Sequence, residues 1–267
     1  MWNSASHVVC PCLMILAIPG LAATEPAAEQ STRPVWESEQ DRTAEPDFLF
    51  GRPRAEIGLR GLWVNPRAHS NIFSFLAEQL TLQRKDFRAQ GVAFDLGLPV
   101  NSRTNAVAGL EYNRASVASA DRTFVEIDGS PIRQDTQLTQ FNVTGSLEFA
   151  LLPRGRAIGQ FAWFTAPVTP YIGAGGGLIL YRFEQIGDFV DLLDPELGIF
   201  EAQLLSDGWT TNTHISGGVD IKITHQLLLN AEARYVWADA TMGPDFVNFE
   251  PIDLSGLRIG GGIRLLF

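Results

Sequence analysis

His214 and Ser216 are the two side chains of this sequence whose types and spacing best suit nucleophilic catalysis. Successive side chains of a β-strand point to opposite faces, so residues two apart share a face. A histidine beside a serine can take the hydroxyl proton and activate the oxygen as a nucleophile. If the strand from Trp209 to Ile223 pairs with the next one around a turn at 224–226, Glu232 lies near enough to orient the histidine. These three residues are therefore a candidate hydrolytic site.

Charged residues recur at alternate positions of the segments that the sequence pattern predicts to be strands. A charge that is removed from water is stable only beside an opposite charge or hydrogen-bond partners. We therefore expect an internal ion network made of Glu56, Arg60, Glu232, Arg234, Arg258 and Arg264. Further charges predicted to point inward are Asp95, Glu111, Glu148, Asp220 and Lys222. The network is interpreted as a plug, and a proton or ion path is the alternative.

Eight segments carry a strand pattern, and in most of them apolar and polar residues alternate with period two. They are Arg54–Val64, Arg88–Leu98, Asn105–Arg114, Thr136–Ala150, Pro170–Phe183, Trp209–Ile223, Leu227–Trp237 and Leu254–Phe267. In Pro170–Phe183 the glycines at 173 and 175–177 leave the two faces unassigned.

The last of these segments ends the chain with an apolar stripe. Ile263, Leu265 and Phe267 lie on one face, and Arg258 and Arg264 lie on the other. Such a terminal strand would be an aggregation-prone edge in water, but in a bilayer the stripe faces lipid. Here the sequence resembles the eight-stranded bacterial outer-membrane barrels of the OmpA, OmpX and OmpW kind. The resemblance implies a location in the cell outer membrane of a Gram-negative bacterium, and implies that Ile263, Leu265 and Phe267 are an assembly signal read by the barrel-assembly machinery.

The predicted fold is an all-β, eight-stranded antiparallel up-and-down transmembrane β-barrel with long extracellular loops. Lipid provides no partner for a free backbone group, and closing an even number of strands removes every sheet edge. Its outward aromatic residues near strand ends suit an interfacial girdle: Trp63, Tyr112, Phe149, Tyr235 and Trp237. A soluble β-sandwich or lipocalin-like barrel is the alternative, and these residues would then belong to its core.

The predicted connections alternate between long and short. The long ones are Asn65–Phe87, Ala115–Asp135, Glu184–Gly208 and Asp239–Asp253. The turns near Pro99 and Thr224 are short, but Leu151–Thr169 is too long for the short periplasmic turn expected there. Either the strand before it is longer than predicted or this connection rests on the membrane surface. Ile72–Leu82, in the first long connection, is the one candidate helix.

The chain divides into three predicted parts. Residues 1–23 are a signal peptide, because the apolar stretch from Val8 to Ala23 is too short to span a membrane as a helix and ends in small residues. Both cysteines, Cys10 and Cys12, lie in it, so no thiol chemistry is expected of the mature chain. Residues 24–53 are an acidic, disordered periplasmic linker, and residues 54–267 are the barrel. The formal net charge of −10 argues against nucleic acid as a partner.

Two of the predicted extracellular loops, Glu184–Gly208 and Asp239–Asp253, contain acidic residues but neither lysine nor arginine. Carboxylate oxygens suit hard divalent cations. The candidates for weak binding of calcium or magnesium are Asp188, Asp191, Asp194 and Glu196. Bound cations would bridge the protein to the phosphates of lipopolysaccharide. Apolar residues between the acids indicate that these loops fold over the barrel mouth or meet a partner.

The function expected from these features is a structural or surface-interaction role in the outer membrane, without enzymatic activity or a cofactor. The expected partners are outer-membrane lipid, lipopolysaccharide, the barrel-assembly machinery and an unidentified extracellular ligand. A narrow porin-like channel for small solutes is the first alternative. The second is a lipid A-modifying enzyme, because His214 and Ser216 with an acid resemble the site of the outer-membrane lipid A deacylases. Gly217 and Gly218 depart from that family's pattern, and the predicted register turns the site away from lipid.

Overall fold

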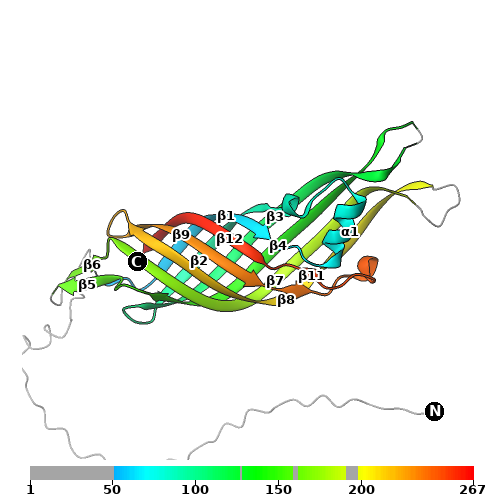
Figure 1. Ribbon diagram of the computed structural model, residues 1–267. Coiled ribbons are helices and arrows are strands. Elements are labelled where there is room, and N and C mark those ends of the chain that lie inside the picture. The colour runs from blue at the N-terminus through cyan, green and yellow to red at the C-terminus, as the bar shows by residue number, and fades with distance from the viewer. Residues whose placement is uncertain (1–50, 127, 159–161, 191–197) are drawn as a thin grey trace, which may run out of the picture. The chain divides into compact units, whose positions relative to one another are not determined.

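The computed structural model describes residues 51–126, 128–158, 162–190 and 198–267 (Figure 1). These residues belong to one compact unit. The predicted signal peptide and all but the last three residues of the predicted linker lie outside the described residues. In the part of the chain that the structure describes, no helix has the length and apolar character needed to cross a membrane.

Eight strands form a closed antiparallel barrel in the order β1–β12–β9–β8–β7–β4–β3–β2 (Figure 1). The barrel strands are β1 (Glu56–Pro66), β2 (Ala89–Pro99), β3 (Thr104–Val125), β4 (Pro131–Ala150), β7 (Val168–Val190), β8 (Ile199–Lys222), β9 (Leu227–Trp237) and β12 (Gly256–Leu266). Barrel strands that follow each other along the chain are neighbours, and the last strand pairs with the first. The predicted eight-stranded up-and-down barrel is confirmed.

The seam between β1 and β12 shows how the alternation of side chains divides the barrel into two surfaces. The two strands pair from Glu56 with Leu266 to Pro66 with Gly256. Outside the barrel, the side chain of Leu59 is 56% exposed, whereas inside it Arg60 and Arg264 are 4% and 3% exposed. The faces predicted for the first and last strands are therefore confirmed.

Strand β7 keeps the same alternation through its glycine tract. Tyr171 and Ile179 are buried on the inside, and the parity between them places Gly173, Gly175 and Gly177 on the inside as well. A Cβ atom on Gly175 would lie 2.8 Å from the Nε2 atom of His214 on β8. The glycines therefore leave room for polar side chains of the neighbouring strands, and the structure assigns faces that the sequence pattern did not.

Two segments that the sequence predicts to be long loops, Ala115–Asp135 and Glu184–Gly208, are largely extensions of the barrel hairpins. Strands β3 and β4 pair as far as Val125 with Pro131, with one irregularity. Strands β7 and β8 pair as far as Val190 with Ile199, and residues 191–197 lie outside the described residues. The prediction ends each strand where the apolar alternation stops. Outside the bilayer a hairpin needs no apolar face, so the pattern no longer marks it.

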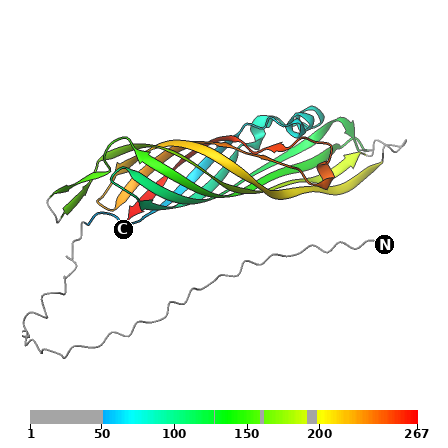
Figure 2. The same cartoon turned by 90° about the horizontal axis from the view of Figure 1, so that it is seen from below.

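The remaining long connections fold at the same end of the barrel as these hairpins (Figures 1 and 2). They contain α1 (Asn71–Gln79), the 3-10 helix η2 (Arg84–Phe87), β10 (Asp239–Ala240), the 3-10 helix η3 (Pro244–Phe246) and β11 (Ile252–Asp253). Helix α1 begins one residue before the start predicted for it, Ile72, and ends three residues before the predicted end, Leu82. We refer to this end as the extracellular end, because outer-membrane barrels have their longer loops outside the cell.

The opposite, periplasmic end holds the start of β1 and the end of β12 (Figure 1). The connection from 151 to 167 lies there and is not a short turn. It forms a hairpin of β5 (Gly155–Ile158) and β6 (Ala162–Thr165), which pair with each other only. The connection that is too long for a turn is thus an additional hairpin, which projects from the end of the barrel (Figure 1).

Deleting Phe267, or replacing it with Lys, is expected to impair outer-membrane assembly. Its backbone N–H donates to the carbonyl oxygen of Ala55 at 2.9 Å, so the residue completes the seam, and its exposed side chain ends the apolar stripe of β12. Surface levels and the heat-modifiable mobility of the folded barrel measure the effect. Val247→Lys, at an exposed position of the extracellular end, is the matched control. Equal surface levels of wild type and the Phe267 variants would contradict the assembly role.

Candidate functional site

The interior of the barrel holds three clusters of paired charges, which follow each other along the strands. The cluster nearest the periplasmic end is centred on Arg264 of β12. Its Nη1 donates to Glu148 at 3.1 Å, to Asp220 at 3.2 Å and to Glu56 at 3.3 Å, and its Nη2 donates to Glu148 at 3.2 Å. These carboxylates come from β4, β8 and β1, so one guanidinium group ties three walls of the barrel together.

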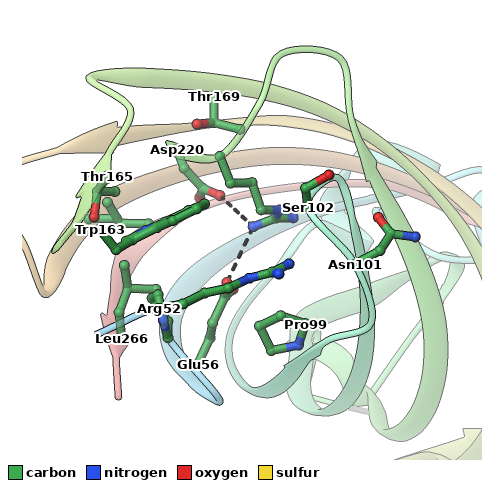
Figure 3. A pocket seen from close by; sticks show the side chains of 13 residues that line it. Arg52, Glu56, Pro99, Asn101, Ser102, Trp163, Thr165, Thr169, Asp220 and Leu266 are labelled. Carbon is green, nitrogen blue, oxygen red and sulfur yellow. Dashed lines mark hydrogen bonds and ion pairs between the residues drawn. The ribbon is translucent and has the colours of Figure 1, made fainter. Parts of the chain in front are cut away.

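A second guanidinium group, that of Arg154 from the periplasmic connection, pairs with the carboxylates of this cluster, of which Figure 3 shows Glu56 and Asp220. Arg154 lies just before β5 and reaches Glu148 at 3.1 Å, Glu56 at 3.4 Å and Asp220 at 3.7 Å. Sequence reasoning missed this residue, because it belongs to a connection rather than to a strand. The only sequence signal for it is that this connection is too long for a turn.

The central cluster is built around Glu232 of β9. Its Oε1 accepts hydrogen bonds from Arg60 at 2.6 Å and from Nε of Arg234 at 3.1 Å, and its Oε2 accepts one from the hydroxyl of Tyr171 at 3.0 Å. Arg60 also donates from Nε to Asp95 of β2 at 2.8 Å. The two guanidinium groups and the hydroxyl that donate to this carboxylate therefore all belong to barrel strands.

The third cluster lies nearest the extracellular end. Arg258 donates from Nη1 to Glu111 of β3 at 2.6 Å and from Nη2 to Gln140 of β4 at 3.1 Å. Glu111 also accepts from the side-chain amides of Asn113 and Asn142 at 3.2 and 3.3 Å. Arg258 is thus paired across the lumen with a strand that lies far from it in the sequence.

Inward glycines make room for these long side chains. A Cβ atom on Gly218 of β8 would lie 2.5 Å from the ring of Tyr171, and one on Gly97 of β2 would lie 3.3 Å from Glu56. At these positions the missing side chain of a glycine leaves the space that a large side chain of a neighbouring strand occupies.

All six residues predicted for the ion network are buried inside the barrel. Their direct ion pairs form three groups, and hydrogen bonds through Tyr171 and Asn230 join the central group to Asp220 of the periplasmic one. Arg60, Glu232 and Arg234 meet in the central cluster, and Glu56 and Arg264 meet in the periplasmic one. Arg258 pairs with Glu111. The sequence identified which charges point inward, but not which of them meet across the lumen.

His214 is buried inside the barrel and contacts a different serine from the one that sequence spacing proposed. Its Nε2 lies 2.9 Å from Oγ of Ser146 on β4, and its Nδ1 lies 3.4 Å from Oδ1 of Asn212. Among the described residues, no hydrogen bond joins His214 to Ser216 or to Glu232. Ser146 could not be found from the sequence, because it approaches His214 across Gly175 of the strand between them.

The predicted cation ligands are only partly within the described residues. Asp188 lies near the end of β7, where its backbone carbonyl accepts a hydrogen bond from Gln134 at 2.8 Å. Asp191, Asp194 and Glu196 lie outside the described residues. Within the described ranges, no three or more His, Cys, Asp or Glu side chains are grouped closely enough to hold a metal ion.

The outer surface of the barrel is apolar around its whole circumference. Every barrel strand contributes exposed aliphatic or aromatic side chains, among them Leu59, Phe94, Leu110, Val143, Ile172, Ile215, Leu229 and Ile263. The aromatic residues Trp63, Tyr112, Phe149 and Trp237 are also exposed, and Tyr235 packs against Trp237 at a ring distance of 4.8 Å. A surface of this kind is stable in lipid and not in water.

A closed barrel with an apolar outside and a charged inside is a transmembrane β-barrel, the architecture of bacterial outer-membrane proteins. The chain is therefore a β-barrel protein of the Gram-negative cell outer membrane, as the sequence predicted. This assignment rests on the closure and the surface of the barrel itself.

Several solved structures of outer-membrane barrels are similar to the chain. Neisserial surface protein A (NspA) is 14% identical, with 81% of this chain covered, 99% of that chain covered and a TM-score of 0.42. OprG from Pseudomonas aeruginosa is 12% identical, with coverages of 81% and 98% and a TM-score of 0.45. Ail of Yersinia pestis, solved with the heparin analogue sucrose octasulfate, is 12% identical, with coverages of 79% and 96% and a TM-score of 0.37. No protein-family model and no curated protein matches the sequence.

Glu111→Ala is expected to destabilise the barrel, because it leaves the guanidinium group of Arg258 buried without its carboxylate. Breaking a buried pair in this way costs about 3–5 kcal/mol. The urea midpoint of unfolding in lipid vesicles measures the loss. Asp207→Ala removes an exposed carboxylate and is the control. Adding Arg258→Met to Glu111→Ala should restore most of the stability, and a double variant as unstable as the single one would contradict this account.

Proposed function

We propose that this protein is a sealed outer-membrane barrel with a structural and surface-interaction role rather than a channel. The observation that carries the proposal is the packing between the central and extracellular clusters. Arg60, Glu111, Glu232, Arg234 and Arg258 lie against Leu62 and Gly260 and leave no space for a water molecule between them. An eight-stranded barrel is just wide enough for its own side chains to fill it.

The extracellular end supports the same proposal with an apolar seal. Phe73 of α1 packs edge-on against Phe87 at a ring distance of 4.9 Å and against Phe183 of β7 at 6.4 Å, and Phe183 contacts Phe246 of η3 at 5.4 Å. These rings belong to a buried apolar cluster that joins α1, the β7 wall and the last long connection. An ion on its way through the barrel would have to cross both this cluster and the charged clusters.

Planar-bilayer recording of the refolded protein tests the sealed lumen. We expect no conductance steps, whereas a general porin that is refolded in the same lipid gives them. Stable unitary steps from the wild-type barrel would overturn the sealed-lumen proposal and favour the narrow channel.

The same packing argues against a lipid A-modifying enzyme. His214 is 2% exposed and faces the lumen, so neither Ser146 nor Ser216 can meet a lipid substrate beside it. We propose that the protein has no such activity. Mass spectrometry of lipid A after incubation with the refolded barrel is the direct measurement, and loss of an acyl chain would contradict the proposal.

A cavity at the extracellular end favours a binding role there. It has a volume of about 260 Å³ and lies among α1, the β3–β4 and β7–β8 hairpins and η3. Its apolar walls are Ile72, Phe75, Leu76, Leu80, Phe124, Phe189, Val190, Leu204, Phe246 and Phe249. Ligand sites are typically concave, largely preformed and mostly apolar.

Most of the polar residues that line this cavity are already engaged with the protein. Gln185 donates to Gln134 at 2.5 Å, and Gln134 donates to the backbone of Asp188 at 2.8 Å. Asp245 accepts from the backbone N–H of Leu205 at 2.9 Å. The cavity therefore offers a ligand mainly apolar contact. We propose that the unidentified extracellular ligand is a small apolar molecule or the apolar part of a larger one, and that lipopolysaccharide surrounds the outer half of the barrel.

Binding of the apolar fluorophore N-phenyl-1-naphthylamine to the barrel in lipid nanodiscs tests the cavity. Phe75→Glu places a charge in the wall of the cavity, so it should weaken binding by about tenfold or more, which corresponds to roughly 1.4 kcal/mol. Val247→Glu changes an exposed apolar residue of the same end that does not line the cavity, so it should bind like wild type. Equal binding by both variants would contradict the site.

A further inference from the structure

The β5–β6 hairpin at the periplasmic end has two different faces. In the pairing of the two strands, Ala157 lies opposite Trp163 and Arg156 lies opposite Phe164. Trp163 and Thr165 face the barrel mouth, where they line a hollow together with Glu56 and Asp220 (Figure 3). The other face carries Arg156, Phe164 and Ile158, all of them exposed.

Contacts with the barrel hold the hairpin in one orientation. The hydroxyl of Thr165 donates to the backbone carbonyl of His225, in the β8–β9 turn, at 3.0 Å. The ring of Phe164 lies edge-on to that of His225 at 5.8 Å. At the base of the hairpin, the guanidinium group of Arg154 is fixed by the carboxylates of the periplasmic cluster. The outer face is therefore presented in a defined direction.

Exposed apolar residues also flank this hairpin where the chain leaves and rejoins the barrel wall. Below the last lipid-facing residues of β4 and β8, the chain exposes further large apolar side chains, each between 41% and 55% exposed. They are Leu151, Leu152, Ile158, Phe164, Val168 and Ile223. Large apolar side chains exposed in such number are unfavourable in water and mark an interaction site. Since the chain enters and leaves the hairpin at barrel strands β4 and β7, whose outer faces lipid covers, the same lipid layer is the nearest partner for these side chains.

Arg156 supplies the charge that such a position requires. It lies directly across the strand pair from Phe164, so the two side chains project from the same face of the hairpin. Aromatic residues favour the membrane–water interface, and an arginine there can extend its head group to lipid phosphates. Carboxylates on the same face would repel those phosphates, but the described residues of β5 and β6 include none.

We propose that the outer face of the β5–β6 hairpin docks on the periplasm-facing leaflet of the outer membrane. Ile158 and Phe164 enter the boundary between head groups and acyl chains, and Arg156 binds phospholipid phosphate. The hairpin thereby fixes the depth of the barrel on one side of the bilayer, through a contact that none of the short turns can make.

Quenching of a site-specific fluorophore by nitroxide-labelled phospholipid tests this docking. The full chain with Cys10→Ser and Cys12→Ser contains no other cysteine, so bimane can be attached singly at Phe164→Cys or at Ile158→Cys. Leu147→Cys on the lipid-facing surface of β4 and Ser102→Cys in the exposed β2–β3 turn are the two reference positions. The vesicles contain phosphatidylethanolamine and phosphatidylglycerol.

We expect quenching at positions 158 and 164 to be close to that at 147 and several-fold greater than that at 102. Arg156→Glu should lower the quenching at 158, while heat-modifiable mobility shows that the barrel is still folded. Quenching at 158 and 164 as low as at 102 would overturn the proposal. A second result would also overturn it: low quenching in vesicles, together with protection of both positions from a water-soluble thiol reagent in intact cell envelopes. That combination would identify a periplasmic protein as the partner.

Discussion

Lipid provides no hydrogen-bond partner for a peptide group, and the rest of this structure depends on that constraint. It requires β1 to pair with β12, and the pairing turns eight strands into a closed wall. Closure brings the inner faces of all strands around a narrow space. Charges on those faces are then buried and must find partners across the barrel, as Arg264 does with carboxylates from three other strands. The sealed interior is therefore a consequence of the membrane outside.

The two ends of the barrel close in different ways. The extracellular end is filled by apolar side chains, many of them from connections, and it keeps a cavity beside them. The periplasmic end is filled by guanidinium and carboxylate groups, and Arg154 of a connection completes it. Connections tolerate sequence changes better than the strands that they join. Barrels with the same arrangement of strands can therefore acquire different functions through their connections. In this protein both proposed interaction surfaces lie largely on such connections.

The fold was predictable because period-two alternation specifies which side chains face lipid. It placed Arg258, Glu111 and Glu232 on the inside, as observed. It could not pair Arg258 with Glu111, because those residues are separated by 147 positions and meet across the lumen rather than along a ladder. The contact of His214 with Ser146 could not be predicted for a related reason. The two residues lie on strands separated by β7, and the alternation pattern does not show that Gly175 of β7 leaves room for the contact. The hairpin extensions were hidden because strands outside the bilayer need no apolar face.

The paired charges also specify the register of the barrel. If β1 slipped by two residues against β12, every apolar side chain would still face lipid, so the alternation alone does not exclude that arrangement. The same slip moves Arg60 by about 6–7 Å along the strand. Its guanidinium group would then leave Glu232, which it now reaches at 2.6 Å, and the ion pair would be lost while both charges stay buried. Similar slips at the other strand pairs would separate Arg258 from Glu111 or Arg264 from Glu148. The apolar pattern permits several strand registers. The observed register is the one in which these charged side chains form their ion pairs.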